Sequence, residues 1–118
     1  MEAVTRDQVK AYIEGKSGPY ILIDVRQPEE LVHGVLPTAQ NLPIDEVEEA
    51  FALPDDAFLR RYRFPKPEKD AVVIFYCRTG GRSARATTIA KEKGYVLAVN
   101  YAGSVYDWSE IDPNVKTY

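Results

Sequence analysis

The sequence predicts a single α/β domain with a mostly parallel sheet and helices on both faces. Short apolar runs rich in β-branched and aromatic residues alternate along the chain with segments of helical pattern, which is typical of such folds. The clearest runs are Tyr20–Val25 and Val72–Tyr76, both bounded by turn residues. Continuous apolar runs of this length are typical of strands buried on both faces. With 118 residues, the chain is long enough for one domain with a single core.

In the first third of the chain, helix signals and strand signals alternate. Thr5 with Gln8 resembles a capping box, so we expect a helix over about residues 5–15. The strand at 20–25 follows, and Pro28 then begins a short helical segment, 29–32. We expect a short strand at 39–42.

The remaining elements follow the same alternation. Helical patterns at 44–50 and 57–62 precede a proline-rich linker at 64–67, which cannot continue a helix. A strand at 71–76 leads through a loop into a helix that begins at Ala84 and ends at Gly94. The last expected elements are a strand at 95–99 and a short helix at 105–108. The polar residues 112–118 are expected to form a loose tail.

Composition excludes several classes of protein. The net charge of −3 argues against nucleic-acid binding, and no apolar run is long enough to cross a membrane. One cysteine cannot form an internal disulfide, and there is no Cys/His cluster for a structural zinc. We therefore expect a protein of a reducing compartment without a metal. The N-terminus lacks the pattern of a signal peptide, which favours a cytoplasmic location, or a mitochondrial one if a presequence is missing.

Three strand ends carry residues that could form a site. Asp24 to Arg26 end one strand, Cys77 ends another, and Tyr101 to Gly103 follow a third. In parallel sheets the functional crevice lies outside the carboxyl ends of the strands. We therefore expect these segments to meet at one edge of the molecule.

The loop after Cys77 has the composition of an anion cradle. A nucleophilic cysteine reacts as the thiolate, which helix N-terminal amides and nearby guanidinium groups stabilise. Glycines allow consecutive N–H groups to point inward, arginines can clamp an oxyanion, and hydroxyl groups can donate further hydrogen bonds. With Cys77 as the nucleophile, the expected binding residues are Arg78, Thr79, Gly80, Gly81, Arg82 and Ser83. Arg82 is the favoured anion contact, whereas Arg78 could equally point to solvent. We interpret Arg85 as a solvated or rim residue.

The order of these motifs resembles the rhodanese family over essentially the whole chain. The resemblance rests on Asp24-Val25-Arg26, the segment from Glu30 to Pro43, the loop from Cys77 to Ser83, Tyr101-Ala102-Gly103 and Trp108. It implies a five-stranded parallel sheet and sulfur transfer through a cysteine persulfide, as in single-domain thiosulfate sulfurtransferases. It also implies thiosulfate as donor and glutathione, a thioredoxin-like protein or cyanide as acceptor, without a cofactor.

Two other functions are alternatives to sulfur transfer. Cysteine-dependent phosphatases of the same fold carry one more loop residue, whereas the loop from Cys77 through Arg82 has six. A non-catalytic interaction module is the other alternative, and the intact cysteine and arginines argue against it. The oligomeric state is not indicated by the sequence.

Several residues outside the loop receive supporting or structural interpretations. Asp24 and Arg26 are expected to hydrogen-bond neighbouring loops, with Arg26 pairing to Glu30. His33 is interpreted as a surface residue. Departures from the family pattern lie at Val35, Thr38 and Ser104, in loops that we expect to tune substrate choice.

Overall fold

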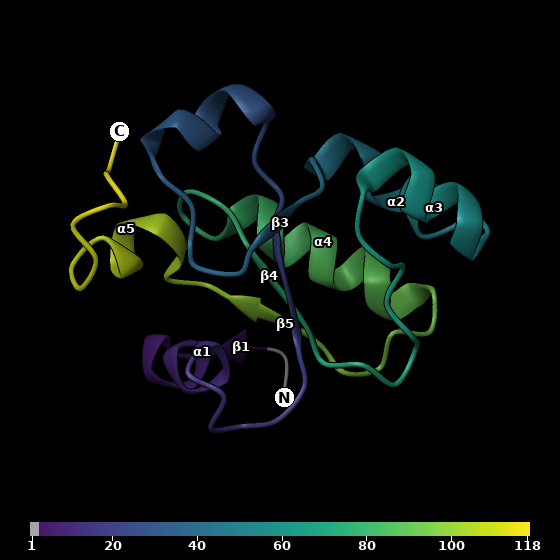
Figure 1. Ribbon diagram of the computed structural model, residues 1–118, viewed down its shortest axis with the longest axis horizontal. Coiled ribbons are helices and arrows are strands. Elements are labelled where there is room, and N and C mark those ends of the chain that lie inside the picture. The colour runs from purple at the N-terminus through teal and green to yellow at the C-terminus, as the bar shows by residue number, and fades with distance from the viewer. Residues whose placement is uncertain (1–2) are drawn as a thin grey trace.

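The computed structural model describes residues 3–118 and contains a five-stranded parallel sheet (Figure 1). The spatial order of the strands is β1-β5-β4-β2-β3, and every neighbouring pair is parallel. The strands are β1 (Ala3–Val4), β2 (Ile21–Asp24), β3 (Gln40–Asn41), β4 (Val73–Tyr76) and β5 (Ala98–Tyr101). The predicted fold class is therefore confirmed.

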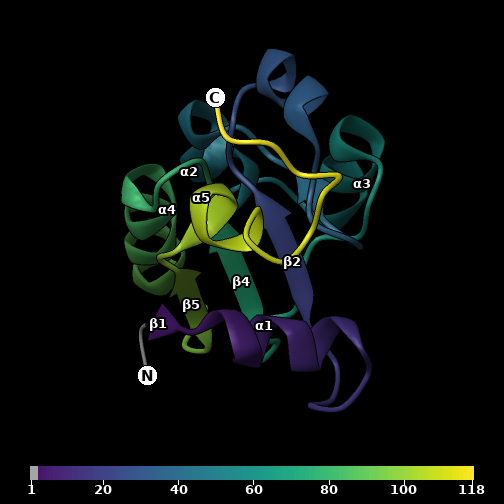
Figure 2. The ribbon, with the colours of Figure 1, turned by 90° about the vertical axis from the view of Figure 1, so that its left-hand side faces the viewer.

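Helices cover both faces of the sheet (Figure 2). α1 and α5 lie on one face, and α2, α3 and α4 lie on the other. The helical elements are α1 (Arg6–Ile13), the 3-10 helices η1 (Pro28–His33) and η2 (Ile44–Glu46), α2 (Val47–Ala50), α3 (Asp55–Tyr62), α4 (Gly81–Glu92) and α5 (Ser104–Trp108). Within residues 3–118, none of them is long and apolar enough to cross a membrane.

Alternate side chains of the central strands enter two separate cores. Ile23 and Phe75 pack with α2, α3 and α4, whereas Leu22 and Ile74 pack with α1 and α5. Successive strand residues point to opposite faces, so a strand between two helix layers must be apolar throughout. All four residues of β4 are buried, which explains the unbroken apolar run before Cys77.

The strand register brings the expected segments to one edge. Asp24 lies opposite Tyr76, and Phe75 lies opposite Asn100, so the carboxyl ends of β2, β4 and β5 are level. The segments that follow these strands meet at this edge, as the sequence predicts.

One strand prediction is wrong in detail, and one strand was not predicted. The apolar run at 95–99 does not form a strand at its start, because the buried Tyr95 hydroxyl donates to the Pro67 carbonyl and Val96 and Leu97 are exposed. The strand begins only at Ala98. β1 was not predicted, because two residues carry no periodic signal, and its place depends on pairing with β5.

The helix predictions are closer to the structure. The Thr5–Gln8 capping box is present at the start of α1. The predicted helical stretch 44–50 divides into η2 and α2, and the segment after Pro28 forms a 3-10 helix. The helix after the cysteine loop begins at Gly81 rather than Ala84, which brings its first turn into the loop itself.

Residues 112–118 pack against the body of the domain, contrary to the expected loose tail. Val115 is buried, and the Lys116 N–H donates to the His33 carbonyl at 2.8 Å. The contact depends on Gly34, which has a φ of 103° and lies directly against the backbone of Asn114 and Val115. This segment, which we call the C-terminal segment, therefore lies along η1.

We expect Gly34→Ala to destabilise the protein more than Gly15→Ala, its matched control. Both glycines have positive φ, so each substitution should cost about 1 kcal/mol in backbone strain. A Cβ at position 15 meets open space, whereas one at position 34 collides with the Asn114 carbonyl, which should add about 1 to 3 kcal/mol. Denaturant unfolding of both variants measures the difference. Equal losses would show that the C-terminal segment does not pack here.

Candidate active site

The sulfur of Cys77 lies in a buried seat between the end of β4 and the start of α4. The Gly80 N–H donates to Sγ over 3.1 Å, and the Ser83 hydroxyl lies 3.4 Å from the same atom. Only 1% of the residue is exposed. The N-terminal end of α4 contributes its partial positive charge to this region. The arrangement suits an anionic sulfur.

The curl of the loop requires a glycine at position 80. Gly80 has a φ of 101°, and a Cβ there would collide with the Ala102 carbonyl. A residue with a side chain would have to push the loop away from the turn after β5, and the Gly80 N–H would leave the sulfur. Gly81 has open space around its Cα, so no such contact restricts it.

The seat lowers the pKa of the Cys77 thiol below its ordinary value. Burial by itself favours the neutral thiol and is the largest single influence. Hydrogen bonds from the Ser83 hydroxyl and from the N–H groups of Ser83, Gly80 and Thr79 act in the opposite direction and together outweigh burial. Hydrogen bonds to the charged form stabilise the thiolate, which is the nucleophilic form.

The Ser83 hydroxyl has two partners but one proton. Its oxygen lies 3.4 Å from Sγ and 3.2 Å from the Gly80 carbonyl oxygen, to which it can donate. When Cys77 is a thiol, the S–H can donate to Ser83 while Ser83 donates to Gly80. When Cys77 is a thiolate, the hydroxyl can turn its proton to the sulfur. Ser83 can therefore stabilise both protonation states.

The Ser104 side chain fixes the backbone of Cys77. The Cys77 N–H donates to the Ser104 hydroxyl at 3.1 Å, and that hydroxyl donates to the Tyr101 carbonyl at 2.8 Å. The Val105 N–H donates to the Cys77 carbonyl at 3.1 Å. The first turn of α5 is thus joined to the loop. Ser104, singled out in the sequence as a departure from the family pattern, positions the backbone of Cys77.

Asp24 and Arg26 form a buried ion pair beside the loop. The guanidinium contacts both carboxylate oxygens at 2.7 to 3.1 Å, and both residues are at most 1% exposed. Burial opposes the charge of Arg26 and is the largest single influence, but hydrogen bonds from Arg26 to Asp24 and Tyr118 and the charge of Asp24 together raise its pKa. Arg26 also donates to the carbonyls of Glu30 and Gly34. The expected supporting contacts are present, but the side-chain pair between Arg26 and Glu30 is not.

Glu30 instead pairs with Arg82. Nη1 and Nη2 of Arg82 donate to the two carboxylate oxygens at 2.7 and 2.9 Å. The Arg82 hydrogen bond is the main reason that the pKa of Glu30 falls to about 2. Arg82, expected from the sequence as the anion contact, thus has one edge of its guanidinium occupied by a carboxylate. Within residues 3–118, its Nε donates no hydrogen bond.

Arg78 extends across aromatic rings at the rim of the site. Its guanidinium carbon lies 4.5 Å from the centre of the Tyr118 ring and 5.4 Å from that of Tyr106. No carboxylate in the described chain lies within 4.0 Å of its side-chain nitrogens. Arg78 is therefore a cation without a paired anion. Thr79 and Arg85 are exposed.

Two residues of the site were not singled out from the sequence. Tyr118 stacks on His33 with ring centres 4.0 Å apart, and its hydroxyl donates to Glu30 at 2.9 Å. Tyr106 donates through its hydroxyl to the main-chain oxygen of Tyr118 at 3.0 Å. His33 is accordingly half-buried under a ring. No local pattern indicates these contacts, because they depend on where the C-terminal segment packs.

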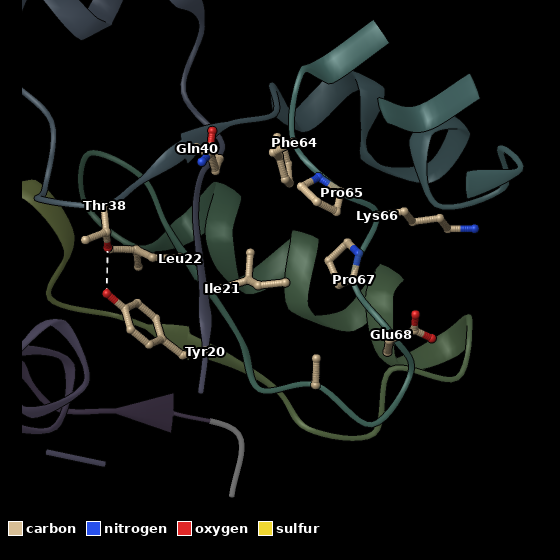
Figure 3. A pocket seen from close by; sticks show the side chains of 11 residues that line it. Tyr20, Ile21, Leu22, Thr38, Gln40, Phe64, Pro65, Lys66, Pro67 and Glu68 are labelled. Atoms are coloured by element: carbon tan, nitrogen blue, oxygen red, sulfur yellow. Dashed lines mark hydrogen bonds between the residues drawn. The ribbon is translucent and has the colours of Figure 1, made fainter. Parts of the chain in front are cut away.

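A pocket of about 510 Å³ lies at the other end of the sheet (Figure 3). Tyr20 and Ile21 line it at the start of β2, together with Phe64, Pro65 and Pro67 of the linker. In a parallel sheet the strand starts are opposite the edge that carries Cys77. Within residues 3–118, no group of three or more His, Cys, Asp or Glu side chains could hold a metal ion.

The sequence matches a known protein family. The model of the rhodanese-like domain matches residues 5–111. The chain belongs to the rhodanese-like domain family.

Similar rhodanese-like proteins include named sulfurtransferases. A putative mitochondrial thiosulfate sulfurtransferase of Schizosaccharomyces pombe is 43% identical over 76% of the chain, and the match spans 63% of that relative, less than two thirds of its length. The thiosulfate:glutathione sulfurtransferase of Homo sapiens is 40% identical over 80% of this chain and 83% of its own. The solved human single-domain sulfurtransferase TSTD1 covers 95% of this chain and 98% of its own, with 34% identity and a TM-score of 0.89.

We expect Ser83→Ala to raise the pKa of Cys77, because the thiolate loses its side-chain donor while the backbone donors remain. The rate of Cys77 alkylation by iodoacetamide, measured against pH, should then have its midpoint at higher pH. Ser109→Ala is the matched control, since the Ser109 hydroxyl donates to the Tyr106 carbonyl and not to the sulfur. Superimposable profiles for Ser83→Ala and wild type would contradict the role of Ser83.

We expect the stability contributed by Glu30 to depend on pH. Its pKa is about 2 in the folded protein and about 4.3 in an unfolded chain, so folding favours the carboxylate. This contribution is present above about pH 4.3 and is lost as pH falls toward 2. The free energy of unfolding of wild type should exceed that of Glu30→Gln by about 1 to 2 kcal/mol near pH 6 and converge with it near pH 2. A pH-independent gap would contradict this linkage.

Proposed function

We propose that this rhodanese-like protein is a sulfurtransferase that carries sulfane sulfur on Cys77 from thiosulfate to a small thiol. The observation that carries the proposal is the buried sulfur seat, in which the Gly80 N–H and the Ser83 hydroxyl face Sγ. The names of the similar proteins point to the same donor, and one of them names glutathione as the second substrate. The proposed unit is a single domain over residues 1–118.

In the first step the Cys77 thiolate attacks the outer sulfur of thiosulfate. A bond forms between the two sulfur atoms, the sulfur–sulfur bond of thiosulfate breaks, and sulfite leaves with its electron pair. Cys77 then carries a persulfide anion, which the same N–H groups and the start of α4 can stabilise. No cofactor is required for this exchange.

In the second step an acceptor thiolate attacks the outer sulfur of the persulfide. The new persulfide leaves on the acceptor, and the electron pair of the broken bond returns to Cys77 as the thiolate. Glutathione is the acceptor we propose first, with a thioredoxin-like thiol or cyanide as alternatives. The donor anion is bound by the loop from Arg78 to Ser83. Asp24 and Arg26 have a supporting role, because Arg26 holds the carbonyls of Glu30 and Gly34 in the neighbouring segment. We propose a cytoplasmic location, with a mitochondrial one as the alternative.

We expect Cys77→Ser to abolish sulfite release from thiosulfate, because a serine hydroxyl has no comparable anionic form at neutral pH. Intact mass spectrometry after thiosulfate treatment should show one added sulfur atom on wild type and none on the variant. Addition of glutathione should remove that atom from wild type. Ser109→Ala, outside the seat, should retain sulfite release and the added sulfur atom.

The same samples separate the alternative functions. Cys77-dependent hydrolysis of an aryl phosphate would favour a phosphatase, and we expect none. Wild type that gains no sulfur from any sulfane donor would favour a non-catalytic module. Sulfite release that persists in Cys77→Ser would rule out the persulfide mechanism.

A further inference from the structure

We infer that Tyr118 is a positioning residue for the donor-anion site, acting through Glu30 on Arg82. The inference rests on the proposed function, in which Arg82 contacts the donor anion. It assigns the C-terminal segment a role in substrate binding. The observation behind it is a continuous series of hydrogen bonds from the Tyr118 hydroxyl to the arginine that closes the cysteine loop.

The Tyr118 hydroxyl uses both of its hydrogen-bonding capacities. It accepts from Nη1 of Arg26 at 3.1 Å and donates to Oε1 of Glu30 at 2.9 Å. Arg26 is fixed in turn by its buried pair with Asp24. One end of the series is thus anchored in the core, and the two hydrogen bonds together fix the position of the Tyr118 hydroxyl.

The ring of Tyr118 is held independently of its hydroxyl. It stacks on His33 with an angle of 13° between the ring planes, and the Arg78 guanidinium lies over it. The Tyr106 hydroxyl holds the main-chain oxygen of the same residue. Because the ring has its own contacts, removal of the hydroxyl alone should leave the segment in place.

Glu30 receives four hydrogen bonds from three directions. Arg82 contributes two, the Gln27 N–H donates at 2.8 Å, and Tyr118 donates the fourth. Oε1 is held by Tyr118 and Arg82, whereas Oε2 is held by Gln27 and Arg82. Loss of the Tyr118 hydroxyl would leave Oε1 with Arg82 alone, so the carboxylate could rotate and the guanidinium would rotate with it.

Arg82 is the member of the series that belongs to the cysteine loop. It is the sixth residue of the loop that begins at Cys77 and lies in the first turn of α4. Glu30 occupies one edge of its guanidinium, and the Nε edge remains available to an oxyanion. A guanidinium held in one orientation binds an oxyanion with less loss of side-chain freedom. Tyr118 therefore sets how well Arg82 is ordered before the donor arrives.

The test compares Tyr118→Phe with Tyr20→Phe. The Tyr20 hydroxyl also makes a side-chain hydrogen bond, at 2.8 Å to Thr38, but it lies at the start of β2 (Figure 3). We expect Tyr118→Phe to raise KM for thiosulfate about 3- to 10-fold and to leave kcat and KM for cyanide unchanged. The reason is that the contact between Arg82 and the donor anion is weakened equally in the ground state and in the transition state. Tyr20→Phe should keep the wild-type KM. An unchanged KM for thiosulfate in Tyr118→Phe overturns the inference.

A double variant tests the route through Glu30. In a Glu30→Gln background the additional Tyr118→Phe change should alter KM for thiosulfate by less than about 2-fold, because residues that act in series are not additive. A full additional increase would place the effect of Tyr118 elsewhere, for example on Arg78, and would overturn the proposed route.

A second readout does not depend on turnover. Inorganic sulfate, an unreactive anion, should protect Cys77 from iodoacetamide, and Tyr118→Phe should need about 3- to 10-fold more sulfate for the same protection. If wild type releases no sulfite from thiosulfate but this difference is present, the proposed function fails and the positioning role stands. If wild type releases sulfite from thiosulfate but sulfate protects wild type and Tyr118→Phe equally, the positioning role of Tyr118 is wrong and the proposed function stands.

Discussion

The hydrogen bond from the Gly80 N–H to the Cys77 sulfur is the constraint on which the rest of the site depends. It requires a backbone with a φ of 101° pressed against the Ala102 carbonyl, which only glycine permits. The loop can hold this shape because the turn after β5 supports it, and because Ser104 takes up the Cys77 N–H. The position of Cys77 is therefore set by the parallel register of β4 and β5, which brings the two strand ends level.

The charges around this seat follow from which guanidinium has a carboxylate partner. Arg26 is neutralised by Asp24 in the core, and Arg82 is balanced by Glu30 at the loop. Arg78 instead contacts aromatic residues, and its guanidinium lies over the rings of Tyr106 and Tyr118. An incoming dianion thus meets one uncompensated guanidinium, the partial charge at the start of α4, and the free edge of Arg82. Under the proposed function, these three groups are the ones that would attract the thiosulfate dianion to the site.

The sequence allows the cysteine loop and its edge of the sheet to be predicted because their signals are local. Glycines, arginines and a serine lie within seven residues after an apolar strand, and parallel strands must end at one edge. The side-chain partner of Glu30 was predicted wrongly. The spacing of four residues from Arg26 suggested a pair between these two side chains, but η1 is a 3-10 helix and its Glu30 carboxylate faces Arg82. The packing of the C-terminal segment could not be predicted either, because its contacts are made with residues far away in the chain. Val115 packs into the core between the sheet, α1 and α5, and Tyr118 donates to Glu30 of η1.

The state of Glu30 also bears on the choice between sulfur and phosphate chemistry. Hydrolysis of a phosphate ester is helped by a general acid that protonates the departing oxygen, and such an acid needs a pKa near the working pH. Glu30 is the carboxyl group bonded to the loop arginine, and its pKa of about 2 leaves it ionised and fully hydrogen-bonded. Asp24 is held by Arg26 in the core. Sulfite, in contrast, departs from thiosulfate as a stable anion and needs no proton. Carboxylates that order arginines, rather than supply protons, are thus consistent with sulfur transfer.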